Sequence, residues 1–476
     1  MSTVTFGARR WAPGFAYVPL AAGGWTVGPV PTIEPRADVW LVFAQEDALA
    51  APNLERIVSI AAAARPDVGA FYADDAALGD SPRRRLKPAF NLPLLAADDY
   101  IGAPLFVRAS VLARLGLREA MGEAALYDLV LRAHAAGVVI ERLTSTLLAY
   151  PGLRPPVPVA DRRKALEAWA AGGPFEVAEG RAEGTLQLKR RFSEFPAVTL
   201  VVPTCQSAGP GGDRPLVAGL LDGLARLDWP MDRLHVLVGD DSDDAGTFEP
   251  SRWPFSLRRV VTTRPPGEPF SYAAKMNRLW PMAETEHLVL LNDDVRITTP
   301  DWLRALLTFS MEEDVGGVGA RLLFPDGRLQ HAGVVLGLFD GVAHAWMGQP
   351  GDAPTYGHWA EVHRDWSVVT GAVFATRRSV MQAAAGFHER FSIELNDVDL
   401  ALRLRLMGYR IVCTPFAEAV HPEKSSRGEA PVAAEQMALF FARWRDYVAD
   451  DPAYHPGLIR NGFVVAPRDE PDWFDR

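Results

Sequence analysis

Acidic residues directly follow two of the strand-like apolar runs in the sequence. Asp293 and Asp294 follow HLVLL together with Asn292, and Asp240 and Asp241 follow LHVLVG. Carboxylates at a strand end can hold a hard divalent ion such as Mg²⁺ or Mn²⁺, and that ion can neutralise a diphosphate. A carboxylate in this place can also accept hydrogen bonds from a nucleobase or a ribose. Acidic turns and helix N-caps are the structural alternatives.

Asp397 and Asp399 form a third acidic group, at the expected start of a helix in NDVDLALRLRL. Asp399 suits the first turn of that helix, where a carboxylate faces the positive end of the helix dipole. Asp397 precedes the helix proper, so we expect it to project into a cleft. A carboxylate in that place can act as the general base on an acceptor hydroxyl.

His421 follows the strand-like run IVCTPFAEAV. Its imidazole can complete a metal shell begun by Asp294, and Lys424 and Arg427 in the next loop can offset diphosphate charge. A lone histidine is more often a surface or satisfied core residue, so the metal interpretation depends on these other groups being close by.

Short apolar runs alternate with amphipathic stretches along the chain, which predicts an α/β fold. Strands are expected at 198–203, 234–238 and 287–291, so the acidic groups after them would share one edge of a parallel sheet, where α/β ligands bind. The stretch GPGGD has neither the GxGxxG spacing nor a Walker lysine, which argues against dinucleotide-binding and P-loop classes.

Two parts of the chain match each other in order, with an insertion in the later copy. The matching pairs are LVFAQEDALAAPNLERIVS with LVLLNDDVRITTPDWLRALLT, RPDVGAFYADDAALGD with EEDVGGVGARLLFPDG, DYIGAPLFVRASVLARLG with VVTGAVFATRRSVMQAAAG, and LYDLVLRAHAAGVVIERLTSTLLAYP with DVDLALRLRLMGYRIVCTPFAEAVHP. Asp47 stands in the place of Asp294, but Leu126 replaces Asp397 and Tyr150 replaces His421. The first copy has too few residues ahead of its first matched strand for a complete domain. We therefore expect a truncated domain at 1–150, a Pro-rich linker with a helix at 151–195, and a complete domain at 196–476.

With these residues together, the second half of the chain resembles the family 2 glycosyltransferases, which have the GT-A fold. The motifs that carry the resemblance are VTLVVPT, VGDDSDD, FSYAAKMN, LLNDDV as the DxD-type motif, VGARLLFPDGRLQHAGVVLG, WSVVTGAVFATRRSVM, GFHERFSIELNDVDLALRLRLMGYRIVCTPFAEAVHPEKSSRG and DPAYHPGL. The resemblance implies a mixed Rossmann-like sheet for the C-terminal domain and a partial GT-A-like fold for the N-terminal one. It implies that the first copy is a pseudo-glycosyltransferase module that packs, binds glycan or makes a dimer contact.

The resemblance also assigns roles to residues of this sequence. It implies that Asp397 is the catalytic base and that Asp294 and His421 hold Mg²⁺ or Mn²⁺. The residues that it places at the nucleotide sugar are Pro203, Thr204, Asp240, Asp241, Lys275, Asn277, Asn292, Asp293, Gly371, Lys424 and Arg427. Those that it places near the acceptor are Trp366, Thr370, His331 and Asp399.

The implied reaction is an inverting, metal-dependent transfer of a sugar from a UDP- or dTDP-sugar to a hydroxyl of a glycan or lipid-linked saccharide. Bacterial cell-surface polysaccharide synthesis is the implied setting, and a homodimer is left open. The QxxRW motif of processive synthases is absent from the sequence, so transfer of one or a few sugars is expected. The alternatives are a catalytically degenerate glycan-binding or assembly subunit and a nucleotidyltransferase.

Charge and hydropathy narrow the partners further. The chain has 49 Lys and Arg against 59 Asp and Glu, a net charge of -10, which argues against a nucleic-acid partner. Apolar runs stay below the ~18 residues of a membrane span, so we expect a cytoplasmic protein with at most peripheral contact with the inner face of the membrane. Cys205 and Cys413 lie in strand-like runs and are expected to be reduced core thiols.

Overall fold

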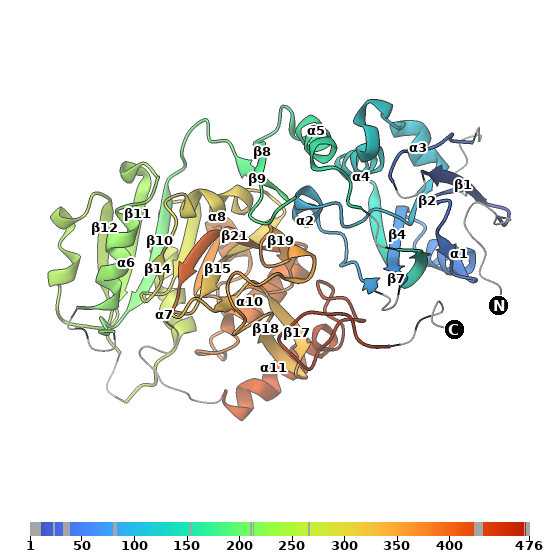
Figure 1. Ribbon diagram of the computed structural model, residues 1–476. Helices are drawn as coiled ribbons and strands as arrows, with labels where there is room; N and C mark the ends of the chain where they lie inside the picture. Colours follow the sequence, from blue (N-terminus) through green and yellow to red (C-terminus); the bar gives the residue numbers. More distant parts are fainter. Residues whose placement is uncertain are drawn as a thin grey trace. The chain divides into compact units, whose positions relative to one another are not determined.

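A computed structural model describes residues 11–21, 24–31, 39–79, 83–152, 155–209, 212, 214–264, 267–422, 432–470 and 472. The chain divides into two compact units (Figure 1). Unit 1 comprises Met1–Leu188, Tyr454–Ile459 and Ala466–Arg476, and unit 2 comprises Lys189–Ala453 and Arg460–Val465. The C-terminal part of the chain therefore belongs largely to the first unit.

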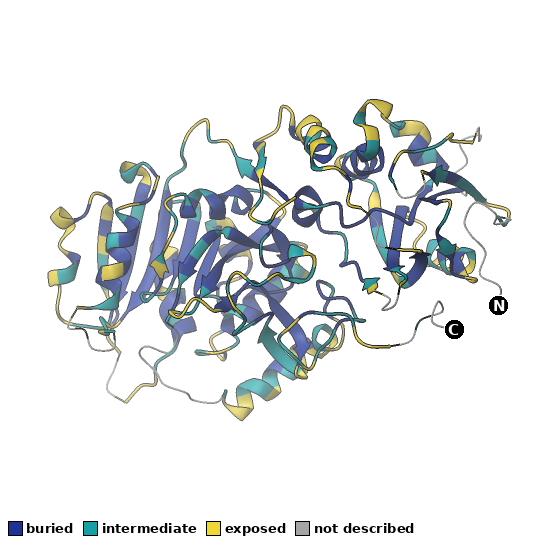
Figure 2. Cartoon of the chain, in the orientation of Figure 1, coloured by how far each residue is buried: buried dark blue, intermediate teal, exposed yellow. Residues whose placement is uncertain are grey.

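Unit 2 is built on a mixed sheet with the strand order β12-β11-β10-β13-β20-β15-β21-β14. The strands are β10 (Val198–Thr204), β11 (Leu234–Asp240), β12 (Ser256–Val261), β13 (His287–Leu291), β14 (Arg296–Ile297), β15 (Val315–Leu323), β20 (Val373–Arg377) and β21 (Arg410–Val420), with β16 (Leu329–His331) beside β15 and β19 (Arg364–Trp366) beside β21. The strands from β10 to β13 run parallel, and β20 is antiparallel to both of its neighbours. Every residue of β10 is buried, as the run VTLVVPT predicts for a strand covered on both faces (Figure 2).

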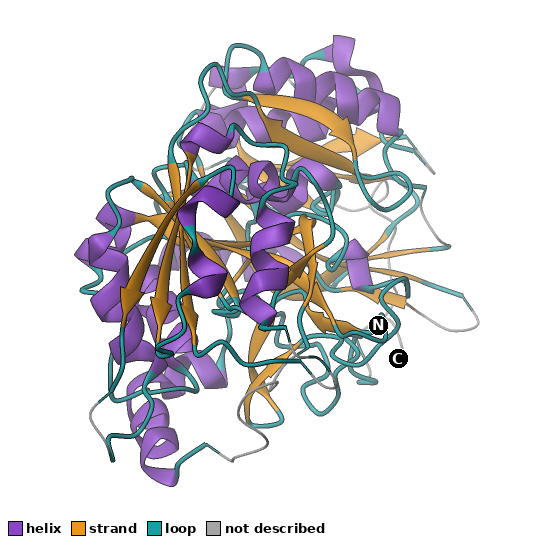
Figure 3. Cartoon of the chain, turned by 90° about the vertical axis from the view of Figure 1, so that its left-hand side faces the viewer, coloured by secondary structure: helices purple, strands orange, loops and turns teal. Residues whose placement is uncertain are grey.

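Helices cover the two faces of this sheet (Figure 3). They are α6 (Leu216–Leu224), α7 (Tyr272–Leu279), α8 (Trp302–Ser310), α9 (Arg378–Ala383) and α10 (Asn396–Leu406). Helix α11 (Ala434–Ala449) packs on a separate hairpin and is linked to α10. This hairpin consists of β17 (Val334–Leu338) and β18 (Gly341–His344). Helix α8 packs on β15 and β21 with eight of its apolar and small polar side chains buried, so the strong helical period of WLRALLTFS is explained by this contact.

Unit 1 has a smaller sheet with the order β1-β2-β6-β4-β7-β3. Its strands are β1 (Phe15–Leu20), β2 (Trp40–Gln45), β3 (Leu49–Ala50), β4 (Val68–Ala77), β5 (Arg83–Arg85), β6 (Leu105–Arg108) and β7 (Val139–Tyr150), followed by the hairpin β8 (Phe175–Glu179) and β9 (Leu186–Arg190). Its helices are α1 (Leu54–Ala64), α2 (Leu92–Ala97), α3 (Ala109–Leu115), α4 (Ala125–Ala135) and α5 (Val159–Ala170).

The repeat expected from the sequence is present in the topology. The path β2-β6-β4-β7-β3 of unit 1 corresponds to β13-β20-β15-β21-β14 of unit 2, and each pair of neighbours runs in the same relative direction in both sheets. Strand β1 takes the place of β10, parallel to the next strand. Among the described residues of unit 1, no strand corresponds to β11 or β12.

The two units divide the chain differently from the expected segments 1–150, 151–195 and 196–476. Helix α5 and most of the hairpin after it belong to unit 1. The buried Arg162 of α5 explains this, because its guanidinium donates to the carbonyl oxygens of Val157 and Ala97. The stretch expected as a linker is therefore largely a packed part of unit 1.

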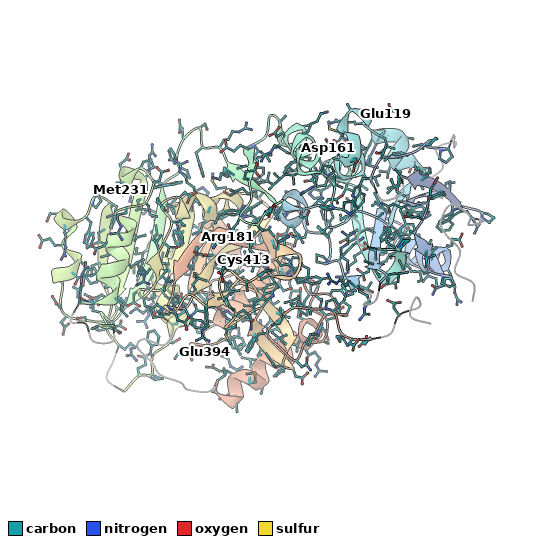
Figure 4. All side chains as sticks on the ribbon, in the orientation of Figure 1. Glu119, Asp161, Arg181, Met231, Glu394 and Cys413 are labelled. Carbon is teal, nitrogen blue, oxygen red and sulfur yellow. The ribbon has the colours of Figure 1, made fainter. Side chains whose placement is uncertain are left out.

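Two smaller expectations concern the cysteines and the membrane. Cys413 is a buried residue of β21, as expected, and is labelled in Figure 4. Cys205 is exposed, so the expectation of a core thiol is wrong there, because β10 ends one residue earlier. In the part of the chain that the structure describes, no helix combines the length and the apolar character that crossing a bilayer requires.

Packing between β15 and β20 leads to a test of the core of unit 2. A Cβ at Gly317 would lie 2.2 Å from the ring of Phe374, so Gly317→Ala should cost about 1–3 kcal/mol of stability through overpacking. Unit 1 has Ala70 and Leu105 at the matching positions, so Phe374→Leu should restore the melting temperature of the Gly317→Ala variant. In contrast, Gly219 in α6 has open space around it, and Gly219→Ala should leave the melting temperature equal or higher. Equal melting temperatures for wild type and Gly317→Ala would contradict the packing described.

Candidate functional site

The candidate site lies where three neighbouring strands of unit 2 end. Strand β10 pairs with β11 up to Thr204 and Asp240, and it pairs with β13 on its other side. Asn292–Asp294 follow β13 directly. The acidic groups predicted from the sequence therefore meet at one edge of the sheet, as expected for parallel strands.

Asp240 is fully buried, and its charge is balanced inside the protein. Its Oδ2 accepts hydrogen bonds from Arg259 Nε at 2.8 Å and from Gln206 Nε2 at 3.0 Å. Its Oδ1 accepts from the backbone N–H of Ser242 at 3.0 Å. Asp240 thus fixes the turn after β11 and the side chains of Gln206 and Arg259, and its contact with a base or ribose stays a prediction.

Lys275 of α7 joins the first two strand ends. Its Nζ forms an ion pair with Asp241 Oδ1 at 2.9 Å and donates to the carbonyl oxygen of Thr204 at 2.8 Å. Burial lowers the pKa of this lysine, and the carboxylate of Asp241 opposes that shift. Thr204 then links to the third strand end, because its hydroxyl donates to Asp293 Oδ2 at 2.6 Å. Pro203, beside it in β10, is buried within the sheet.

His421 lies against the other end of the acidic turn. Its Nε2 is 3.1 Å from Asp294 Oδ1 and 3.4 Å from Asn292 Nδ2. Its Nδ1 is 2.8 Å from Gln330 Oε1, so the amide oxygen of Gln330 assigns the proton to Nδ1 and leaves the Nε2 lone pair facing Asp294. Gln330 Nε2 also donates to the backbone oxygen of His421 at 3.0 Å, which holds the ring in place.

The pair of Asp294 and His421 fits a divalent cation. Adjacent ligands of an octahedral ion with bonds of ~2.1 Å lie ~3 Å apart, close to the observed 3.1 Å. Among the described residues no group of three or more His, Cys, Asp or Glu converges on one point. Mg²⁺ commonly takes one or two protein ligands and completes its shell with phosphate oxygens and water, so this pair suits a metal that arrives with a diphosphate.

Opposing interactions set the pKa of Asp293. Burial raises its pKa from 3.8 to about 6, and the charge of Asp294 adds to this rise, whereas the Thr204 hydroxyl and Lys275 lower it. Burial and the neighbouring carboxylate therefore oppose ionisation of Asp293, and a cation bound at this turn would favour it.

Asp397 stands at the start of α10, next to a backbone N–H that fixes its carboxylate. Gly371 N–H donates to Asp397 Oδ2 at 2.7 Å, and Val398 N–H donates to Oδ1 at 2.8 Å. Leu395, just before the helix, has a φ of 63°, a conformation that costs a branched residue energy and that recurs at functional sites. Burial raises the pKa of Asp397, although these hydrogen bonds and the Thr370 hydroxyl oppose the shift. A carboxylate with a raised pKa suits a general base.

A short loop connects Asp397 with the cation pair. Thr370 N–H points at His331 Nε2 at 3.4 Å, Gly371 binds Asp397, and the carbonyl oxygen of Ala372 accepts from Asn292 N–H at 3.0 Å. His331 is fully buried, and burial holds its pKa well below the usual range, so its neutral ring supports the loop from inside.

Besides His331, two more residues assigned to the acceptor lie in the core in this structure. Trp366 is fully buried, with Arg364 against its face and Trp346 and Trp359 edge-on to its ring. Its surroundings match a packed aromatic cluster and leave no face for stacking on a sugar.

Asp399 is also fully enclosed. Its carboxylate accepts from Arg403 at 2.8 Å and from Arg443 and Trp444 at 3.1 Å, so it braces α10 and α11. Unit 1 repeats this brace with Asp128 and Arg132 at 2.7 Å. A brace present in both copies points to a structural role for Asp399, as its place in the first helical turn suggested.

Three residues expected at the donor have other surroundings or fall outside the structure. Asn277 donates to the carbonyl oxygen of Phe387 at 2.9 Å and to Glu389 at 3.0 Å, so its amide holds a neighbouring loop. Lys424 and Arg427 lie outside the described residues.

The site also contains Gln330, Gln206 and Arg259, which were not predicted from the sequence. Gln330 precedes His331 in the motif GRLQHAG, so the motif contained it, but nothing in its spacing indicated that its side chain would reach His421. Arg259 follows another arginine in β12, and only the pairing of that strand with β11 places it beside Asp240.

In unit 1, a lysine binds the loop that corresponds to residues 370–372 of unit 2. Lys87 is buried, and its ammonium pairs with Asp75 at 2.9 Å and donates to the carbonyl oxygens of Ile101 at 2.6 Å and Ala103 at 3.0 Å. Ile101 and Ala103 correspond to Thr370 and Ala372. Burial lowers the pKa of Lys87 to about 8, so its amine is still mostly protonated at pH 7. The loop of unit 1 is therefore bound by a cationic side chain of the protein itself.

Comparison with known proteins finds relatives over the whole chain. The family described as "Glycosyltransferase like family 2" matches residues 196–438. The O-antigen biosynthesis protein RfbC of Myxococcus xanthus is 32% identical over 445 residues, covering 89% of this chain and 34% of that protein. An uncharacterized protein of Sinorhizobium fredii is 30% identical over 473 residues, covering 93% of this chain and 50% of that protein. The chain thus spans about a third and a half of the lengths of these two relatives.

Further relatives match smaller parts of the chain. The N-acetylglucosaminyl-diphospho-decaprenol L-rhamnosyltransferase of Mycobacterium tuberculosis is 28% identical over 246 residues, 48% of this chain and 78% of that enzyme. Among solved structures, a mannosyltransferase from Pyrobaculum calidifontis in complex with GDP-Man and Mn²⁺ matches with 18% identity and a TM-score of 0.35, covering 70% of this chain and 82% of that one. With a TM-score this low, the assignment of a GT-A-like sheet to unit 2 rests on the family match and the strand order.

The support of His421 by Gln330 can be tested through metal affinity. Gln330→Leu removes the acceptor for His421 Nδ1–H, so the affinity of the chain for Mn²⁺ in the presence of UDP should fall by about 10- to 100-fold. Gln382→Leu, at an exposed position of α9, is the matched control and should bind as wild type. Calorimetric titration measures both variants, and an unchanged affinity in Gln330→Leu would show that the ring is held by other contacts.

The raised pKa of Asp293 predicts a pH effect on stability in metal-free buffer. Its folded-state value of about 6 lies above the unfolded value of 3.8, so its stabilising contribution is complete below about pH 4 and is lost as the pH rises through 6. Asp293→Asn cannot titrate, so its melting temperature relative to wild type should rise between pH 4 and pH 7, by an amount equivalent to at most about 3 kcal/mol. Asp232→Asn, at an exposed site, should follow the wild-type profile. A constant difference between Asp293→Asn and wild type would contradict the assignment.

Proposed function

The chain belongs to glycosyltransferase-like family 2, and from that membership we propose that unit 2 transfers a sugar from a nucleoside-diphosphate sugar to an acceptor hydroxyl with inversion at the anomeric carbon. The observation that carries the proposal is the held carboxylate of Asp397, which shares the 370–372 loop with the acidic turn at Asn292–Asp294. A base and a diphosphate site on one rigid loop are what a single displacement requires.

Asp397 takes the proton from the acceptor hydroxyl in this mechanism. The N–H of Gly371 keeps Oδ2 in one orientation, and a side chain at Gly371 would crowd the carboxylate, because its Cβ would lie 3.1 Å from that of Asp397. The deprotonating oxygen attacks the anomeric carbon from the side opposite the diphosphate, so the carbon–oxygen bond to the diphosphate breaks as the new one forms. Base catalysis of this kind contributes ~10²–10⁴-fold to a rate.

The diphosphate side of the site is assigned to the acidic turn. Asp294 and His421 Nε2 would hold Mg²⁺ or Mn²⁺ together, and the ion when bound neutralises the charge of the leaving nucleoside diphosphate. Thr204, Asp240, Asp241 and Lys275 form the buried wall beside it. We assign the nucleoside to this wall, since the resemblance placed those residues there and the structure gathers them at one strand edge.

The relatives guide the choice of substrates. A lipid-linked diphosphate saccharide is the acceptor named for the mycobacterial rhamnosyltransferase, and O-antigen synthesis is the role named for the Myxococcus protein. We extend these to the present chain as a UDP- or dTDP-hexose or deoxyhexose donor and a bacterial surface saccharide acceptor. Unit 1 is then a pseudo-glycosyltransferase, because it has Leu126 for the base, Tyr150 for the histidine and Lys87 in its loop.

The role of Asp397 has a direct test. Asp397→Asn keeps an oxygen that can accept from Gly371 but loses the basic charge, so turnover should fall by at least ~10²-fold while nucleotide-sugar binding stays within a few-fold of wild type. Release of nucleoside diphosphate is followed with a panel of UDP- and dTDP-sugars and Mn²⁺, and binding is measured by calorimetry. Asp326→Asn, on an exposed turn, serves as the matched control.

Two outcomes would overturn the assignment. Loss of donor affinity with turnover intact would place Asp397 in binding, and an unchanged rate would exclude it as the base. A chain that binds no nucleotide sugar with or without Mn²⁺ would instead be the degenerate glycan-binding or assembly subunit.

A further inference from the structure

Unit 1 contains a cavity of about 520 Å³. Its walls come from the start of α1, from β4 and β7, and from the C-terminal segments that belong to unit 1. Small-molecule sites typically enclose ~300–1,000 Å³. The lining does not include Glu46, Asp47 or Tyr150, the counterparts of the diphosphate side of unit 2, so the cavity is distinct from the decayed donor site.

A break in strand pairing opens this cavity. Strands β4 and β7 pair at Ala73 and Leu143, and the ladder resumes at Asp74 and Thr146. The residues between, 144 and 145, stay outside the ladder and line the cavity. Bulges of this kind re-aim side chains and are frequent beside binding sites.

In unit 2, an arginine side chain occupies the space beside the corresponding bulge. Strands β15 and β21 shift register at the matching place, between Ala320 and Arg321. Arg321, the counterpart of Asp74, is buried there, pairs with Glu418 and donates to the carbonyl oxygen of Gly351. The cavity beside Arg321 measures about 50 Å³. A short aspartate in place of a long arginine therefore accompanies the larger space in unit 1.

A buried carboxylate–imidazole pair forms part of the wall. Asp74 is 1% exposed, and it accepts from Lys87 N–H at 2.7 Å and lies 2.8 Å from His455 Nε2. His455 Nδ1 accepts from Gly457 N–H at 2.9 Å, so the ring proton is on Nε2, which lies beside Asp74 without forming a hydrogen bond. The remaining lone pairs of this fixed carboxylate are acceptors for hydroxyl groups.

Neutral polar side chains stand on the same wall of the cavity. Within the described residues, Asn53, Thr144 and Ser145 make no hydrogen bond through their side chains. Asn53 occupies the N-cap position of α1 without capping an N–H of the helix. These groups supply donors and acceptors in the cavity, and Ile57, Leu86 and Leu147 add apolar surface.

The arginine side chains that line the cavity already bind groups of the protein. Arg468 donates to the carbonyl oxygens of Leu458 and Pro456 and pairs with Glu470 at 3.1 Å, and Arg84 donates to the carbonyl oxygen of Arg468. Guanidinium groups held by carbonyl oxygens are poor receptors for phosphate, and the lining carries both signs of charge. The chemistry that remains is that of a neutral ligand with many hydroxyl groups.

We propose that this cavity of unit 1 is a binding site for a neutral saccharide, held by the Asp74–His455 pair and by Asn53, Thr144 and Ser145. The unpaired polar side chains bind hydroxyl groups, and the aliphatic side chains contact the C–H faces of the sugar ring. This proposal concerns binding alone and does not depend on the transfer proposed for unit 2.

The test uses the full chain in EDTA without nucleotide. The probes are glucose, galactose, rhamnose, N-acetylglucosamine and their disaccharide methyl glycosides at millimolar concentration, observed by saturation-transfer NMR and titrated to saturation. Ser145→Tyr fills the cavity and should weaken binding of the best probe by at least ~10-fold. Asn53→Ala removes one hydrogen bond without removing a cap and should weaken binding by about 3- to 10-fold.

Ser251→Tyr, at an exposed position of unit 2, is the matched control and should bind as wild type. Binding of UDP with Mn²⁺ should be equal in all variants, which separates this result from the function of unit 2. Saturable binding that is lost in Ser145→Tyr and weakened in Asn53→Ala supports the proposal. Absence of binding to every probe, or equal binding by wild type and both cavity variants, would overturn it.

Discussion

The crowding of carboxylates at one edge of the sheet in unit 2 is the constraint on which the site depends. Asp240 and Asp241 lie at the end of β11, and Asp293 and Asp294 follow β13 on the other side of β10. Like charges gathered at one edge of a sheet oppose one another. Arg259 neutralises the first and Lys275 the second, both from inside the protein. Asp293 accepts from the hydroxyl of Thr204, and Asp294 lies beside His421, the residue that we propose as its partner in holding a metal ion.

The two units share a strand path but differ in the side chains that surround the corresponding loop. The carbonyl oxygen of Ala372 in unit 2 accepts from the N–H of Asn292, whereas that of its counterpart Ala103 in unit 1 accepts from the ammonium of Lys87. The structural brace survives in both copies, as Asp128 with Arg132 and Asp399 with Arg403. The brace is thus common to both copies, whereas Leu126 and Tyr150 of unit 1 stand in the places of Asp397 and His421.

Much of this arrangement could be predicted from the sequence, because strand ends, acidic turns and the internal repeat are local or linear patterns. The meeting of Asp293, Asp294 and His421 followed from parallel strands ending at one edge. The burial of Trp366 could not be predicted, because it depends on Arg364 and two tryptophans distant in sequence. The same holds for Gln330, whose side chain reaches His421 across β15, and for the C-terminal segments that join unit 1.

The claim that the chain has one nucleotide site, in unit 2, is tested most directly by calorimetric titration of the full chain with UDP and dTDP, with and without Mn²⁺. The account predicts metal-dependent binding with a stoichiometry of one nucleotide per chain, abolished by Asp294→Asn, because the matching place in unit 1 holds Lys87. Binding of two nucleotides per chain, or binding that is indifferent to both Mn²⁺ and Asp294→Asn, would contradict it.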